Sequence, residues 1–174
     1  MKKTQLVVLA LLAVGVFAGA QSLGVASQPA VPDGVVEKGE YSWSQTFGVI
    51  TLHLSRTGER LFAAVEAQAE GWVGIGFGSV RMADAHIFIG YVQGGTVEMQ
   101  QHRGRGHSHK VLEDAVELEY SLREEGGKTT MELSVPVDAF VTAGQQSLEL
   151  IIACSRGDRT RGRHSYRHGL SVEL

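Results

Sequence analysis

Met82 lies in a polar stretch of the sequence, where its sulfur could bind a metal. Met82 lies between Arg81 and Asp84, directly before the apolar run 86–92. A thioether in such a connecting segment either packs over the end of a core or acts as a soft metal ligand. The residue pattern alone favours packing, the ordinary role of methionine, and leaves the ligand role open.

The histidines supply further possible ligands in two groups. His102, His107 and His109 share the segment HRGRGHSHK, which we interpret as a polar loop whose H-x-H pair suits copper or zinc. His164 and His168 lie in a second basic segment before the last strand. Neither group has the fixed spacing of a zinc signature. The sequence also lacks C-x-x-C-H, so any haem would be held without thioether bonds.

A glycine-punctuated run, GWVGIGFGS, precedes Met82 at residues 71–79. If it is a strand, its bulky residues share one face, while Gly74, Gly76 and Gly78 leave the other face nearly bare. Glycine inside a strand marks a bulge or a close approach of backbone or ligand. The bare face therefore accepts either a neighbouring sheet or a flat, bulky group.

Short alternating runs dominate the rest of the chain and must position these residues. Glycine-containing or polar turns separate them, which is typical of an all-β sandwich or barrel. A short helical turn is expected at 137–141, after Pro136. The expected strands include 50–54, 61–65, 96–99, 116–122, 130–135 and 170–174.

The start of the chain resembles an export signal. Residues 1–20 combine Lys2 and Lys3 with an apolar stretch and a small-residue cleavage site, and 21–36 are expected to form a flexible tail. We therefore expect a periplasmic or secreted protein that does not itself span a membrane. The formal net charge of −3 argues against a nucleic-acid partner. Cys154, the only cysteine, is expected to be a buried small hydrophobe.

Two motifs resemble those of the DOMON domain family. They are the block GWVGIGFGS followed by Met82 and the run ADAHIFIGYV, and the closing HSYRHGLSVEL, in which H-x-x-R precedes the last strand. The similarity covers residues 37–174. It implies an immunoglobulin-like antiparallel β-sandwich that binds haem or sugars.

In the haem-binding branch, which includes the cytochrome domain of cellobiose dehydrogenase, a methionine and a histidine hold the iron. By motif position these correspond to Met82 and His164, with His168 as the rival ligand. The chain departs from the family pattern at His86, where an aspartate is usual, so this residue is expected to move the loop or to add a ligand.

The resemblance also implies roles for residues around the group. Trp72, Phe77 and Phe88 are expected to pack against the macrocycle, and Arg163 and Arg167 to pair with its propionates or to remain solvated.

These observations favour an exported haem b domain that passes electrons to an unidentified redox partner, without enzymatic activity of its own. The alternative is a carbohydrate or small-ligand module without haem, using Trp43, Trp72 and Tyr91 as stacking surfaces. A third hypothesis is a copper or other metal site at His102, His107 and His109, as described above.

Overall fold

The protein is described by a computed structural model that covers residues 22–160 and 163–174. The predicted signal peptide, 1–20, lies outside the described residues.

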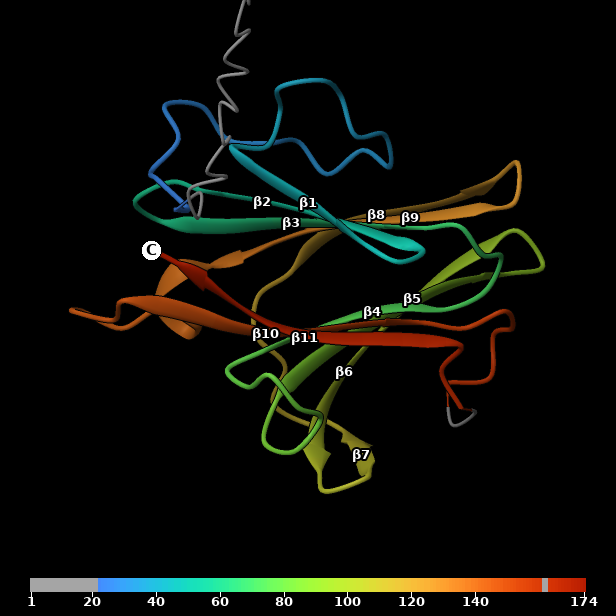
Figure 1. Cartoon of the computed structure of the whole chain (residues 1–174). Helices are drawn as coiled ribbons and strands as arrows, with labels where there is room; N and C mark the ends of the chain where they lie inside the picture. The colour runs from blue at the N-terminus through green and yellow to red at the C-terminus, as the bar shows by residue number, and fades with distance from the viewer. Residues whose placement is uncertain (1–21, 161–162) are drawn as a thin grey trace, which may run out of the picture.

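Two antiparallel sheets are stacked face to face (Figure 1). One sheet has the strand order β1-β2-β3-β9-β8 and the other β11-β10-β4-β5-β6-β7. The predicted all-β sandwich is therefore confirmed. The strand bounds are β1 Trp43–Phe47, β2 Ile50–Arg56, β3 Arg60–Ala67, β4 Val73–Phe77, β5 His86–Gln93, β6 Thr96–Arg105, β7 Ser108–Val111, β8 Glu119–Glu125, β9 Lys128–Pro136, β10 Ser147–Cys154 and β11 Tyr166–Glu173.

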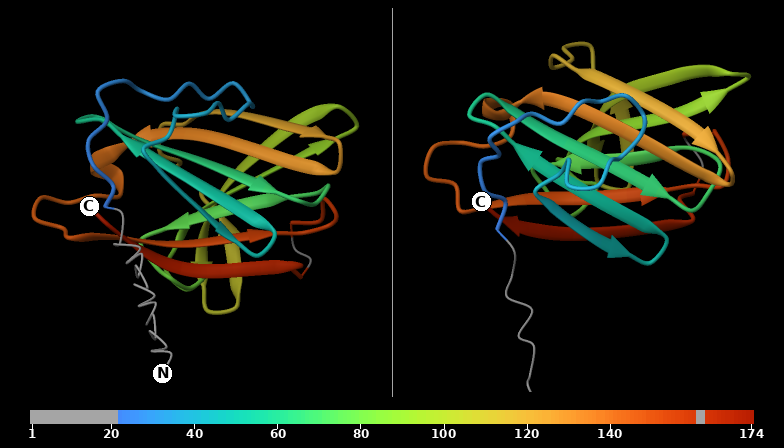
Figure 2. Two further views of the ribbon diagram at one scale, coloured as in Figure 1. Left: turned by 45° about the horizontal axis from the view of Figure 1, so that its top comes forward. Right: turned by 90° about the horizontal axis from the view of Figure 1, so that it is seen from above.

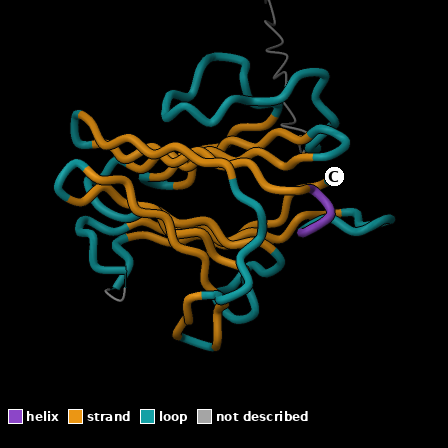
Figure 3. The backbone as a smooth tube through the Cα atoms, turned by 180° about the vertical axis from the view of Figure 1, so that it is seen from behind, coloured by secondary structure: helices purple, strands orange, loops and turns teal. Residues whose placement is uncertain are grey.

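The core fills the space between the two layers that Figure 3 shows in profile. Alternate residues of each strand point into it, because successive side chains of a strand face opposite ways. Phe77 and Phe88, from adjacent strands of the six-stranded sheet, meet edge to face with ring centroids 5.8 Å apart. Leu133 of the opposing sheet belongs to the same buried cluster. Cys154 is fully buried there, as predicted.

Most of the expected strands and the helical turn are present, the latter as η1, Val137–Ala139. Two expectations are wrong. The segment 102–110, expected as a loop, is mostly a hairpin, since β6 continues to Arg105 and β7 begins at Ser108. The last strand begins at Tyr166, four residues earlier than expected, and so contains His168.

The segment 22–36 begins beside the end of β2, where Val25 pairs with Arg56, and then crosses over the outer face of the five-stranded sheet (Figure 2). Leu23 is fully buried in the main core cluster, and its backbone N–H donates to the carbonyl of Glu173 at 2.7 Å. Ala30 is buried in a second, smaller cluster with Tyr41. This segment thus contributes to the described fold.

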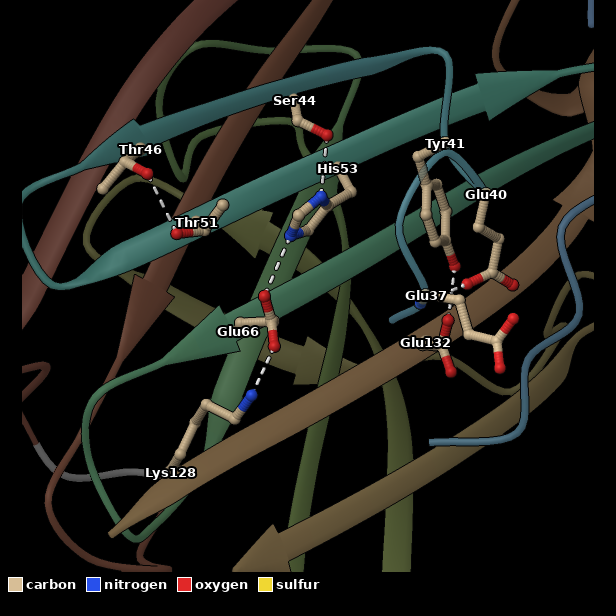
Figure 4. A network of polar contacts seen from close by, with 10 residues as sticks. All are labelled: Glu37, Glu40, Tyr41, Ser44, Thr46, Thr51, His53, Glu66, Lys128 and Glu132. Atoms are coloured by element: carbon tan, nitrogen blue, oxygen red, sulfur yellow. Dashed lines mark hydrogen bonds and ion pairs between the residues drawn. The ribbon is translucent and has the colours of Figure 1, made fainter. Parts of the chain in front are cut away.

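Polar residues continue this outer layer (Figure 4). The buried carboxylate of Glu132 accepts hydrogen bonds from the Tyr41 hydroxyl at 2.7 Å and from the backbone N–H of Gly34 at 2.6 Å. Burial raises the pKa of Glu132, although both hydrogen bonds act in the opposite direction. Glu132 therefore holds the N-terminal segment against β9.

Candidate functional site

The outer face of the six-stranded sheet carries an apolar floor where a sandwich usually presents polar residues to water. Trp72, Ala85, Ile87 and Ile89 form a buried cluster on this face, against which Ile151 packs. The floor exists because β4, most of β5 and the end of β10 from Leu150 to Cys154 are apolar on both faces, unlike half-buried strands, which alternate. An apolar surface outside the core is a candidate ligand surface.

The glycines of β4 leave space that neighbouring side chains of the floor occupy. A Cβ built on Gly76 would come within 2.8 Å of the Ile151 side chain and 3.1 Å of Ala85. One built on Gly74 would come within 3.2 Å of the Phe88 carbonyl oxygen. Neighbouring side chains thus close over the glycine positions, and the expected bare face is an apolar surface of methyl groups and an indole ring.

A pocket of about 750 Å³ opens above this floor. Its walls come from three segments that are distant in the sequence, namely the β4–β5 loop, the β6–β7 hairpin and the β10–β11 loop with the start of β11. Figure 1 shows that hairpin projecting from the six-stranded sheet, away from the other layer. The wall residues are Met82, His107, Ser108, His109, Thr160, Arg163, His164 and Arg167.

The loop that carries Met82 lies flat across two further glycines. A Cβ on Gly104 of β6 would lie 1.5 Å from the Met82 carbonyl oxygen, and one on Gly169 of β11 would lie 2.0 Å from that of Val80. Any side chain at either position would overlap the loop backbone. These two glycines therefore allow the loop to cross the sheet and bring Met82 to the pocket.

Hydrogen bonds fix the same loop to β6. The backbone N–H of Asp84 donates to the Gly104 carbonyl at 3.1 Å, and that of Gly104 donates to the Ala85 carbonyl at 2.9 Å. Asp84 has a φ of 65°, and it is the only non-glycine residue with positive φ in the part of the chain that the structure describes. Aspartate tolerates this left-handed conformation better than most residues, so the sequence suits the turn.

The two rival histidines differ in position. His164 lines the pocket together with Met82. Partial desolvation at the wall, followed by the positive charge of Arg167, lowers the pKa of His164. His168 alternates with Arg167 on β11 and stacks on Phe47 of the opposite sheet, with ring centroids 4.5 Å apart.

Three aromatic residues that the sequence associated with the ligand occupy different places. Trp72 lies in the pocket floor. Phe77 and Phe88 point from the opposite face of their strands into the inter-sheet core. Phe77 has the parity of Ile75 on β4, and Phe88 of β5 lies directly opposite Ile75. His86 also faces inward, stacked on Phe88 at 4.9 Å, so it is directed away from the pocket.

His102 and His109 face each other on neighbouring strands, with their Nδ1 atoms 3.0 Å apart. His102 Nε2 lies 3.1 Å from Gln100 Oε1, an acceptor, so this nitrogen carries the proton of a neutral ring. His102 Nδ1 therefore accepts from His109 Nδ1–H. Burial and the charge of His109 lower the pKa of His102 from 6.5 to about 4.

The three histidines of the third hypothesis do not converge as a metal site. His102 and His109 bond to each other, and His107 is exposed at the pocket wall. Within residues 22–160 and 163–174, no group of three or more His, Cys, Asp or Glu side chains is placed to hold a metal ion.

Sequence reasoning missed the two glycines beneath the Met82 loop and the contribution of β10 to the floor. The signal for the first was the glycine of the R-G-R segment at 103–105, which we assigned to a loop. The signal for the second was the run IIAC at 151–154, apolar at consecutive positions and thus on both faces of its strand.

Fold and pocket together define a β-sandwich that carries a ligand site on the outer face of one sheet. The sequence model of the DOMON domain matches residues 48–153. The chain therefore belongs to the DOMON domain family. The matched segment contains Met82 and ends before His164. No curated protein matches the chain.

Solved structures of similar fold include two cytochrome domains. The cytochrome b domain of pyranose dehydrogenase from Coprinopsis cinerea has a TM-score of 0.57 and 13% sequence identity, covering 71% of this chain and 76% of that one. The cytochrome domain of cellobiose dehydrogenase from Myriococcum thermophilum has a TM-score of 0.55 and 11% identity, covering 76% and 81%. At these identities the likeness concerns the fold. No helix among the described residues is long and apolar enough to cross a membrane.

The pocket residues are chemically suited to a haem group. The pocket offers a thioether, an imidazole, an apolar floor and two arginines, which match the iron, the macrocycle and the carboxylates of haem b. The indole N–H of Trp72 is also buried without a hydrogen-bond partner among the described residues. Buried donors without a partner are rare in native proteins, and each one needs an explanation.

Proposed function

We propose that this protein is an exported haem b-binding electron-transfer domain in which Met82 and His164 are the axial ligands. One observation carries the proposal. Met82 and His164 come from loops far apart in the sequence, yet both line one pocket above an apolar floor. The fold shared with two cytochrome domains supports it.

Each part of the pocket has a role in this proposal. The thioether of Met82 and a neutral His164 imidazole would hold the iron, and Arg163 and Arg167 would neutralise the carboxylates. The floor around Ile87 and Ile89 excludes water from one side. A haem with methionine and histidine ligands supplies a one-electron carrier of raised potential with no open position for substrate. The protein would pass electrons to a redox partner rather than catalyse a reaction itself.

The test is absorption spectroscopy of the purified protein after reconstitution with hemin. We expect a sharp Soret band and, after reduction, the resolved α and β bands of low-spin haem. Met82→Ala and His164→Ala should lose the low-spin bands, because each removes one axial ligand. Met99→Ala is the matched control, because its side chain lies outside the pocket described above, and His168→Ala tests the rival ligand.

Each result has a defined meaning. If His168→Ala loses the low-spin bands while His164→Ala keeps them, the ligand assignment is wrong and the haem proposal survives. If the wild-type protein binds no hemin, the haem proposal fails. Glycan binding would then test the haem-free alternative. However, Trp43 lies in the inter-sheet core and is only 6% exposed, so it is not available as a stacking surface.

A further inference from the structure

The pocket mouth carries a charge opposite to that of the whole chain. The sequence has 19 acidic and 16 basic side chains, for a formal net charge of −3. Arg163 and Arg167 line the pocket. A second pocket of about 600 Å³ shares Met82 and Arg167 with the first and adds Arg81. Neither pocket has a carboxylate in its lining.

These arginines have no carboxylate partner in the described part of the chain. All ion pairs found there involve residues between His53 and Lys128 that belong to the five-stranded sheet or the segment leading into it. Asp84 and Asp158 belong to the same two loops as the arginines, but line neither pocket. The mouth is thus a locally positive region on an acidic protein.

A bound haem would leave part of this positive charge in place. Its two carboxylates would compensate the two arginines of the first pocket. Arg81, which lines only the second pocket and is exposed, would remain uncompensated. The oxidised iron within the dianionic porphyrin adds one further positive charge.

Local charge rather than net charge governs the approach of a partner at ordinary salt. Charges further away than the screening length of about 8–10 Å contribute little. The acidic side chains of the opposite sheet are therefore screened, while the arginines at the mouth act directly on an approaching surface.

We propose that the pocket mouth docks a redox partner through a carboxylate-rich surface of that partner, with Arg81 as the arginine left to pair once haem carboxylates occupy Arg163 and Arg167. This inference rests on the proposed function for the direction of electron flow, but its charge basis does not depend on haem. Arginines suit this role because they pair with carboxylates through two parallel hydrogen bonds.

The first test measures the sign of the salt effect on electron transfer. Reduced holoprotein is mixed in a stopped-flow instrument with ferricyanide, a trianion, or with tris(phenanthroline)cobalt(III), a trication. We expect oxidation by ferricyanide to slow as salt is added and oxidation by the cobalt complex to accelerate. The net charge of the chain predicts the opposite for both reagents. The inference is overturned if added salt accelerates oxidation by ferricyanide and slows oxidation by the cobalt complex.

Two variants locate the charge. Arg81→Gln should lower the ferricyanide rate at low salt about two- to threefold, the effect of one screened charge on a trianion. Arg123→Gln removes an equal charge from β8, where Arg123 pairs with Glu125, and should leave the rate unchanged. Equal rates for the two variants would refute the assignment to the mouth.

A haem-independent test uses the apoprotein on a sulfopropyl cation exchanger at pH 7.5. We expect retention despite the negative net charge, lost in the double variant Arg81→Gln/Arg163→Gln and kept in Arg123→Gln. If hemin binding fails while this retention persists, the proposed function falls and the positive docking surface stands. If hemin binds but the double variant elutes with the wild type, only the docking inference is overturned.

Discussion

His102 shows at the scale of one residue how burial fixes a charge state. The ring is 4% exposed and faces His109 Nδ1 to Nδ1. Burial, and after it the charge of His109, lowers the pKa of His102 from 6.5 to about 4. A neutral His102 ring, in contact with His109, then supports the β6–β7 hairpin beside the pocket.

This pair predicts a pH-dependent loss of stability. The folded protein binds the His102 proton less readily than the unfolded chain, so its contribution is complete above pH 6.5 and lost as pH falls to about 4. The loss amounts to roughly 3 kcal/mol in the free energy of unfolding. Urea denaturation of wild type and His102→Gln at several pH values measures it, because the variant lacks this proton. If the free energy of unfolding has the same pH dependence in both proteins, His102 is not the group responsible.

The Met82 loop is the element on which the candidate site depends. Its path over Gly104 and Gly169 leaves no space for a side chain at either position. The hydrogen bonds of Asp84 and Ala85 to β6 fix it at the same place. Small changes in β6 should therefore act on the position of the sulfur.

Gly104→Ala tests this dependence. The added Cβ would lie 1.5 Å from the Met82 carbonyl oxygen, so the loop must move. We expect a loss of about 1–3 kcal/mol in the free energy of unfolding. In the hemin-reconstituted protein we also expect loss of the low-spin bands. Gly58→Ala is the control, since its Cβ would meet no atom within 4 Å. A Gly104→Ala protein that matches this control in both measurements would show that the loop does not depend on the glycine.

Sequence alone predicted the elements whose signals are local. The alternating runs identified most strands of the five-stranded sheet, and the glycine alternation of 74–78 identified the pocket face of β4. The hairpin at 102–111 was missed because it depends on pairing with β5, where His102 lies opposite Ile87. Its glycine and arginine content resembles a loop, and the tertiary partner overrides that preference.

The sequence predicted which residues could be ligands at the candidate site, but not how the residues around them are arranged. Met82 and His164 were linked by family motifs, since nothing in their spacing brings them together. Phe77 was assigned to the ligand although its parity places it in the core, a distinction that the strand period supplies. The arginine-lined mouth depends on how three loops meet, which the chain order does not encode locally.

At the scale of the whole molecule, the outer faces of the two sheets differ in what covers them. The five-stranded sheet covers its outer face with the N-terminal segment and with polar groups such as Glu132 (Figure 4). The six-stranded sheet leaves its outer face open as the pocket floor. The covered face supports stability, and the open face forms the floor of the candidate pocket.

The N-terminal segment should therefore contribute to global stability. Leu23 is 0% exposed, and its carbonyl accepts from Arg56 Nε at 3.1 Å, which ties the segment to β2. Leu23→Ala should lower the free energy of unfolding by about 2–4 kcal/mol, through lost burial and the cavity left behind. Val25→Ala is the matched control, because Val25 is 63% exposed two residues away. Urea denaturation of both variants measures this difference. Equal midpoints would mean that the segment does not contribute to the stability of the sandwich. A selective loss for Leu23→Ala would mean that the cooperative unit begins well before β1, and that removing the segment weakens the scaffold beneath the pocket.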